Sequence, residues 1–180
     1  MNALTQIDFT ILNFIKQNFS CAFFDFIMPK ITMLADKGFL WILCGIILLF
    51  IKKYRKYGIC MLVCLAIGAT VTSAVIKPIV ARPRPFIQTD NIKLLIDAPK
   101  DMSFPSGHTM ASVISAIIIT AVSKKAGIFA WITAILIIFS RLYLYVHFPS
   151  DIAASAVIAA AISVSALKIL KKGGKPFVRP

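Results

Sequence analysis

Apolar residues in this chain gather in long runs, and short basic clusters separate most of these runs. Five such runs stand out, at residues 38–51, 58–76, 109–122, 126–146 and 151–170. Apolar stretches of this kind are typical of helices that cross a lipid bilayer. The pattern therefore predicts five transmembrane helices.

The first 35 residues have a different pattern. In residues 4–19, apolar positions recur at helical spacing with Asp8, Lys16 and Gln17 between them, which predicts an amphipathic helix at the membrane interface. Residues 21–35 are apolar but contain Asp25, Pro29 and Lys30. This segment is either a sixth span or a shallow re-entrant helix. The N-terminus has no basic region of the kind that opens a signal peptide, so we expect the mature chain to begin at Met1.

These elements together predict an all-α integral membrane protein, a six-helix transmembrane bundle with an interfacial N-terminal helix. We expect a single membrane-embedded domain over residues 1–180. Its parts are the interfacial helix at 1–20, the first spans at 21–76, an extracytoplasmic loop at 77–108, the last three spans at 109–170 and a cytoplasmic tail at 171–180.

Apolar residues make up 59% of the chain, and its net charge is +13. The basic residues flank apolar runs and do not alternate with aromatic residues, which favours a membrane over a nucleic-acid partner. The more basic side should face the cytoplasm. That side holds Lys52, Lys53, Arg55, Lys56, Lys124, Lys125, Lys168, Lys171, Lys172, Lys175 and Arg179. The opposite side holds fewer: Lys77, Arg82, Arg84, Lys93, Lys100 and Arg141.

Three polar clusters lie at the non-cytoplasmic ends of the predicted spans. They are Lys77 with Arg84-Pro85, Pro105-Ser106-Gly107-His108, and Ser140-Arg141 with His147 and Asp151. Singly, each has an ordinary explanation, such as an interfacial cation, a helix start or a first-turn carboxylate. Those explanations do not account for both histidines of the chain lying on one face with several cations.

A phosphate group would find its ligands among these clusters. Phosphate is bound by fixed cations and by backbone N–H groups at a helix N-terminus. Lys77, Arg84 and Arg141 supply the cations. Ser106 and Gly107 open the next helix, where Gly107 lets the backbone approach the ligand and the Ser106 hydroxyl can add a hydrogen bond.

Displacement at phosphorus also needs a nucleophile and a proton donor for the leaving oxygen. Asp151 follows His147 closely enough to reach back and orient its ring, so His147 is the predicted nucleophile. His108 is then the acid, and later the base that activates water. We expect no metal and no cofactor, because the chain has no glutamate and the cations replace a metal ion.

These residues resemble the three motifs of the type 2 phosphatidic acid phosphatase superfamily, K-x6-R-P, P-S-G-H and S-R-x5-H-x3-D. Here Lys77 to Pro85, Pro105 to His108 and Ser140 to Asp151 fit all three. The resemblance implies a six-helix membrane bundle, metal-independent phosphatase activity and the same division of roles between His147 and His108. The chain's small size is similar to that of bacterial members acting on undecaprenyl diphosphate or phosphatidylglycerophosphate.

Several alternatives stay open. We expect a lipid phosphate or diphosphate as substrate in a bacterial cell membrane, with undecaprenyl diphosphate preferred over phosphatidylglycerophosphate or phosphatidate. A lipid transporter would instead carry ionisable groups deep within its spans, where the five clear runs have almost none. Ser155, Ala159 and Ser163 form a small-residue face that favours close helix packing within the chain, with a homodimer as the alternative.

Overall fold

The computed structural model describes residues 3–89 and 92–172, and it is all-helical there. Lys175 and Arg179 of the expected cytoplasmic tail lie outside the described residues. The elements are α1 (Ala3–Phe19), α2 (Ala22–Met33), η1 (Asp36–Gly38), α3 (Phe39–Phe50), α4 (Arg55–Thr70), η2 (Val71–Ile76), α5 (Lys77–Val80), η3 (Pro85–Ile87), α6 (Gly107–Val122), α7 (Lys124–Tyr143) and α8 (Pro149–Lys172).

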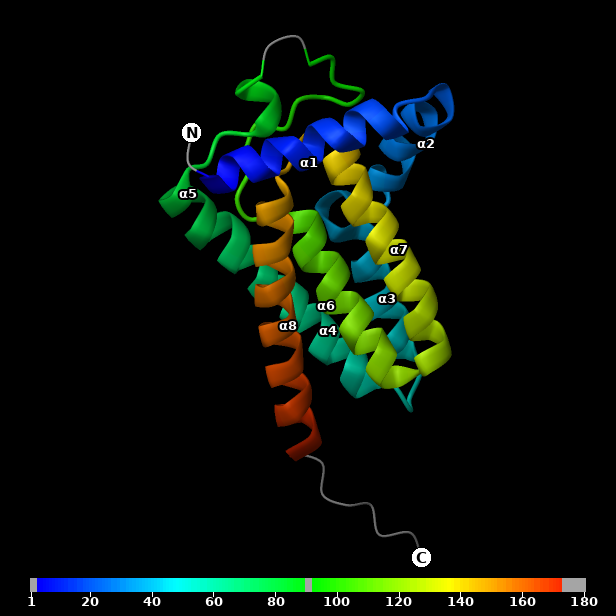
Figure 1. The fold of residues 1–180 in the computed structure, drawn as a ribbon. Helices are drawn as coiled ribbons and strands as arrows, with labels where there is room; N and C mark the ends of the chain where they lie inside the picture. Colours follow the sequence, from blue (N-terminus) through cyan, green and yellow to red (C-terminus); the bar gives the residue numbers. More distant parts are fainter. Residues whose placement is uncertain (1–2, 90–91, 173–180) are drawn as a thin grey trace, which may run out of the picture.

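Each of the five apolar runs becomes a helix of the bundle in Figure 1, namely α3, α4 with η2, α6, α7 and α8. Within the described residues, three helices are long and apolar enough to cross a membrane, at Arg55–Ile87, Lys124–Tyr143 and Pro149–Lys172. The bent pair formed by α2 and α3 could be a fourth span, and α6 is shorter but apolar. Large apolar side chains are exposed along these helices, as suits a bilayer environment.

The segment at 21–35 does not form a separate long helix. Its helix α2 joins the helix that follows at a bend of 43°. Two consecutive residues at the bend, Lys37 and Gly38, have positive φ angles of 52° and 75°, a left-handed conformation that glycine adopts readily and lysine rarely does. The bend places Asp36 beside the start of α6, as described below.

Helix α1 lies across one end of the bundle, the same end as the loop that follows α5 (Figure 1). Its apolar residues Leu4, Ile7 and Phe14 are exposed, as expected for an interfacial helix. The sequence pattern placed Asp8 on the polar side of this helix. In the structure Asp8 is instead buried against the bundle, because it pairs with an arginine there.

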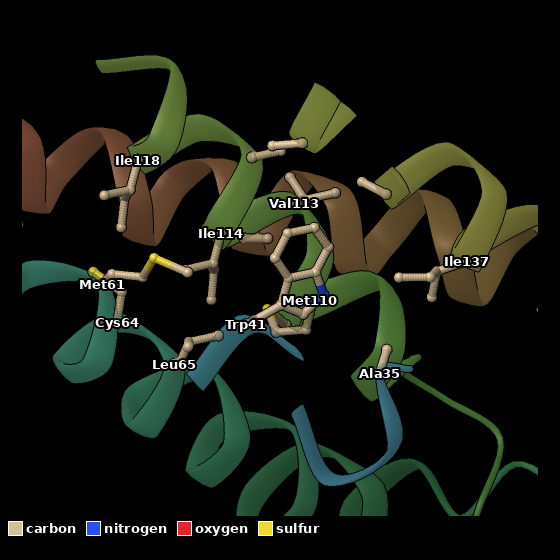
Figure 2. Close-up of a cluster of buried hydrophobic side chains, with 14 of the residues drawn as sticks. Ala35, Trp41, Met61, Cys64, Leu65, Met110, Val113, Ile114, Ile118 and Ile137 are labelled. Atoms are coloured by element: carbon tan, nitrogen blue, oxygen red, sulfur yellow. The ribbon is translucent and has the colours of Figure 1, made fainter. Parts of the chain in front are cut away.

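The largest core cluster lies between α3, α4, α6, α7 and α8. Figure 2 shows Trp41 among Met110, Val113 and Ile114, and the Trp41 indole N–H donates to Ser112 Oγ at 3.0 Å. Helices α3 and α4 come very close at Gly58, where a Cβ atom would lie 2.8 Å from the Gly45 carbonyl oxygen. The core therefore holds the helices that carry the polar clusters in fixed positions.

The small-residue face of α8 packs within the chain. Ser155, Ala159 and Ser163 are fully buried, and Ser155 Oγ accepts a hydrogen bond of 2.7 Å from the Ser106 backbone N–H at the start of α6. This contact fixes the start of α6 against α8. The intramolecular interpretation of this face is therefore the one that the structure bears out.

Candidate active site

A cavity of about 890 Å³ lies at the end of the bundle near α1 and collects most of the predicted site residues. Its polar lining includes Lys77, Arg84, Gly107, His108, Arg141 and His147. The rest of its wall is largely apolar and comes from α2, α3, α4 and α6, with Met33, Ile42, Leu62, Leu65 and Met110 among its residues. A charged pocket thus continues into an apolar one.

His147 lies in the short connection between α7 and α8 and is 1% exposed. Its Nε2 atom is 3.3 Å from an Arg84 guanidinium nitrogen, and its Nδ1 atom is 3.5 Å from Asp151 Oδ2. The second distance is within ion-pair range, yet Nδ1 has no hydrogen-bond partner among the residues that the structure describes. Burial lowers the pKa of His147 to about 3, and the positive charges of Arg84 and Arg141 also lower it. Asp151 acts in the opposite direction but does not compensate. The ring is therefore neutral at physiological pH.

Asp151 opens α8 and is completely buried. Its Oδ2 accepts from Ser103 Oγ at 2.5 Å and from the Phe148 backbone N–H at 2.9 Å. Its Oδ1 accepts from Arg82 at 2.7 Å. Both carboxylate oxygens are held in place, so the one that faces His147 cannot turn away.

Lys77 and Arg84 are buried cations, and both pair with the carboxylate of Asp101 from the loop before α6. The Arg84 guanidinium also donates to the Val146 carbonyl at 2.6 Å, next to His147. Burial alone would raise the pKa of Asp101, but the hydrogen bond from Lys77 and the charge of Arg84 hold it at about 2. The Asp101 carboxylate, a group of the protein itself, is therefore paired with both cations.

Arg141 projects from the last turn of α7 and is 3% exposed. One guanidinium nitrogen donates to Thr32 Oγ1 at 2.5 Å, whereas its Nε has no hydrogen-bond partner in the described part of the chain. Thr72 also lines the cavity and is 1% exposed, and its hydroxyl likewise has no partner among the described residues. Buried polar groups without partners are rare, so both mark places where a polar ligand would be stabilised.

Gly107 and Ser106, the two residues expected to bind phosphate through the backbone and a hydroxyl, have different positions at the start of α6. Gly107 lines the cavity. Ser106 is the N-cap of α6, and its Oγ accepts from the Thr109 N–H at 3.3 Å and from the Thr109 hydroxyl at 3.0 Å. The Ser106 hydroxyl therefore stabilises the helix start, and the residue does not line the cavity.

His108 lies one residue further along α6 and lines the same cavity as His147. Its Nε2 is 3.0 Å from Oδ1 of Asp36, which the bend between α2 and α3 presents to it. Each histidine thus has a carboxylate partner, Asp151 for His147 and Asp36 for His108.

The sequence alone does not identify five residues that contact the site or support it: Asp8, Asp36, Arg82, Asp101 and Ser103. Each of the acidic residues acts on a partner more than 20 positions away, and a lone aspartate in a helix or a loop gives no local signal of such a contact. Arg82 did carry a signal, since it precedes Pro83 in the same short motif as Arg84. In the sequence analysis, Arg82 contributes only to the charge of the less basic side of the membrane.

Comparisons with known proteins identify the class. Residues 57–175 match the model of the PAP2 superfamily, so this chain belongs to that family, as its motifs predicted. An undecaprenyl-diphosphatase of Sulfolobus acidocaldarius is 34% identical over 138 residues, which is 76% of this chain and 66% of that protein.

Two further similarities agree in fold and family. Undecaprenyl-diphosphatase BcrC of Bacillus subtilis is 31% identical over 138 residues, covering 77% of this chain and 70% of the relative. The crystal structure of a PAP2-type phosphatidylglycerolphosphate phosphatase from Bacillus subtilis superposes with a TM-score of 0.81 at 24% identity, covering 98% of this chain and 90% of that one. The all-helical fold expected from the sequence is confirmed.

Proposed function

We propose that this protein is a metal-independent lipid phosphatase that acts through a phosphohistidine intermediate on His147, with undecaprenyl diphosphate as its substrate. The observation that carries the proposal is the cavity itself. It combines a buried neutral histidine with the three cations Lys77, Arg84 and Arg141, and it continues into an apolar wall. That combination suits a phosphate group attached to a long hydrocarbon chain.

In the first step, His147 Nε2 attacks phosphorus, a nitrogen–phosphorus bond forms, and the bond to the leaving oxygen breaks. We assign the ring proton to Nδ1, which faces Asp151, so that Nε2 carries no proton and can attack phosphorus once the phosphate replaces its contact with Arg84. His108 donates a proton to the leaving oxygen. Lys77, Arg84 and Arg141 stabilise the charge that spreads over the remaining phosphate oxygens.

In the second step, a water oxygen bonds to phosphorus, the bond between phosphorus and His147 Nε2 breaks, and His108 accepts the proton that the water loses. Phosphate then leaves and both histidines return to their starting states. Asp36 supports these transfers because its carboxylate stabilises the charged form of His108. The positive charge that a metal ion would supply elsewhere comes from the three cations, so the proposed reaction uses no metal and no cofactor.

The lipid nature of the substrate is supported by the apolar part of the cavity, whose helices also expose apolar residues outward. The choice of undecaprenyl diphosphate is supported by the names of the two relatives above 30% identity. The alternative is phosphatidylglycerophosphate or phosphatidate, and the structural neighbour named for the first of these is 24% identical.

We also propose a location in the cell membrane of a bacterium with the cavity on the extracytoplasmic face. The basic connections between α3 and α4 and between α6 and α7 lie at the end of the bundle opposite to α1 (Figure 1). By the positive-inside rule, that end should face the cytoplasm. With α2 and α3 taken as one broken span, α1 lies on the same side as the cavity and the chain leaves α8 on the cytoplasmic side. A homodimer stays a prediction.

Phosphate release from a panel of lipid phosphates in EDTA tests the proposal. Wild-type protein should release phosphate from undecaprenyl diphosphate faster than from phosphatidylglycerophosphate or phosphatidate. His147→Ala and His108→Ala should each lose most of this activity. Undiminished turnover by His147→Ala would reject the phosphohistidine route, and faster hydrolysis of a glycerophospholipid would reject the substrate.

A further inference from the structure

Arg82 joins two buried carboxylates that are distant in sequence. One guanidinium nitrogen donates to Asp151 Oδ1 at 2.7 Å, and the other pairs with Asp8 Oδ2, also at 2.7 Å. Asp8 is 1% exposed and Asp151 is fully buried. Neither aspartate lines the cavity, so this arrangement lies behind the phosphate site.

Asp8 is fixed from a second direction as well. Its Oδ1 accepts from the Ser150 backbone N–H at 2.9 Å, and its Oδ2 accepts from Ser150 Oγ at 2.5 Å. Ser150 directly precedes Asp151 in the first turn of α8. Helix α1 is thereby attached to the turn that carries the partner of the nucleophile.

The Arg82 guanidinium also stacks on an aromatic ring. Its central carbon lies 3.8 Å from the centre of the Phe148 ring, and Phe9 of α1 meets the same ring edge-on with centroids 5.2 Å apart. Ion pairs on both nitrogens and a ring against one face leave the guanidinium a single orientation. The hydrogen bond from this guanidinium to Oδ1 therefore also fixes the orientation of the Asp151 carboxylate.

The charges of the group favour the proposed chemistry. The carboxylates of Asp8 and Asp151 exceed the Arg82 guanidinium by one negative charge, which partly offsets the positive charges of Arg84 and Arg141 beside the His147 ring. The imidazole becomes positive when it attacks phosphorus, and a fixed negative charge at short range stabilises that state. A buried ion pair is a weak source of stability by itself, so positioning is the better explanation for burying three charges here.

We propose that Arg82 and Asp8 are positioning residues for the His147–Asp151 pair, and that they link helix α1 to the nucleophile. The inference rests on the proposed phosphatase function. Arg82 acts on Asp151 directly, and Asp8 acts through Arg82 and Ser150. Loss of either should slow formation of the phosphohistidine and leave substrate binding nearly unchanged, because Lys77, Arg84 and Arg141 are untouched.

The test measures kcat and KM on undecaprenyl diphosphate in detergent for Asp8→Asn, Arg82→Lys, Arg82→Gln and the double variant Asp8→Asn/Arg82→Gln. Asn13→Ala is the matched control, because Asn13 is also on α1 and accepts a hydrogen bond of 2.8 Å from the Tyr145 hydroxyl without reaching Asp151. Melting temperatures of all variants are recorded in the same detergent.

Asp8→Asn should lower kcat about tenfold and Arg82→Gln up to about a hundredfold, by analogy with the losses of about 10- to 100-fold that follow removal of the residues orienting metal-ligating histidines. Arg82→Lys should recover part of the Arg82→Gln loss, and KM should change less than about twofold. The double variant should lose less kcat than the product of the two single losses, because Asp8 acts partly through Arg82.

Two results would overturn the inference while the phosphatase proposal survives. One is an active wild type in which Asp8→Asn loses no more kcat than Asn13→Ala. The other is a set of losses that add in the double variant and follow the melting temperatures, as a purely structural role would give. A wild type that releases no phosphate from any lipid on the panel would instead reject the proposed function, and this inference with it.

Discussion

The Asp101 carboxylate pairs with Lys77 and Arg84, the two cations that the proposed substrate would also need. Replacing Asp101 should therefore tighten phosphate binding. An incoming phosphate must displace this carboxylate or bind beside a like charge, and both alternatives weaken binding. Asp101→Asn keeps the shape of the side chain and removes the competing charge.

The size of the effect follows from the exposure of Asp101. Its side chain is 55% exposed, so solvent screens the two ion pairs. Exposed pairs contribute about 0.2–1 kcal/mol each. Two such pairs amount to roughly 1 kcal/mol, which corresponds to about a fivefold lower dissociation constant for a phosphate-like anion.

The assay is inhibition by inorganic phosphate and by orthovanadate, which can mimic the transition state of phosphoryl transfer. Asp101→Asn should lower both inhibition constants about fivefold. Asp97→Asn is the control: Asp97 lines the same cavity but makes no ion pair with the described residues, so its loss should have a smaller effect. Weaker inhibition of Asp101→Asn than of the wild type would refute the competition and assign Asp101 a supporting role.

Three further variants separate activity from stability. Among the described residues, a Cβ at Gly107 would meet only Thr72 Cγ2, at 3.9 Å, so Gly107→Ala should keep its melting temperature. It should lose at least about tenfold in kcat/KM, because the methyl group would enter the proposed phosphate site; unchanged activity would contradict this placement. Gly58→Ala should do the reverse, losing about 1–3 kcal/mol of stability in a denaturation assay, because its Cβ would strike the α3 backbone at 2.8 Å. His147 has a pKa of about 3 when folded against about 6.5 when unfolded, so the unfolded chain binds the extra proton and stability should fall by up to about 1.4 kcal/mol per pH unit as the pH drops below 6.5. His147→Gln should show a correspondingly shallower loss of melting temperature between pH 7 and pH 5, and equal slopes would contradict the neutral buried ring.

The helices could be predicted because their signal is local. An apolar run indicates a helix from its own residues, and the five clear runs correspond to the helices α3, α4, α6, α7 and α8. The segment at 21–35 was ambiguous for a physical reason. Its helix is too short to cross alone and joins α3 at a bend, which depends on the positive φ angles at Lys37 and Gly38.

The site was predicted only as far as its motifs reach. Lys77, Arg84, Arg141, His108 and His147 line one cavity as the motif spacing implied. The contacts that orient them come from elsewhere in the chain: Asp8 reaches Arg82 across 74 positions and Asp36 reaches His108 across 72. Such pairings depend on how helices pack, and no spacing rule in a single sequence describes them.

The phosphohistidine mechanism is tested most directly by trapping the covalent intermediate. His108→Ala removes the proposed proton donor and the base that activates water, so a phosphorylated enzyme should accumulate when this variant meets undecaprenyl diphosphate. Mass spectrometry after rapid quenching at high pH, where phosphohistidine survives, should place the added phosphate on His147, and His147→Ala should show none. Phosphate on another residue, or full turnover by His147→Ala without any labelled intermediate, would contradict the assignment of His147 as the nucleophile.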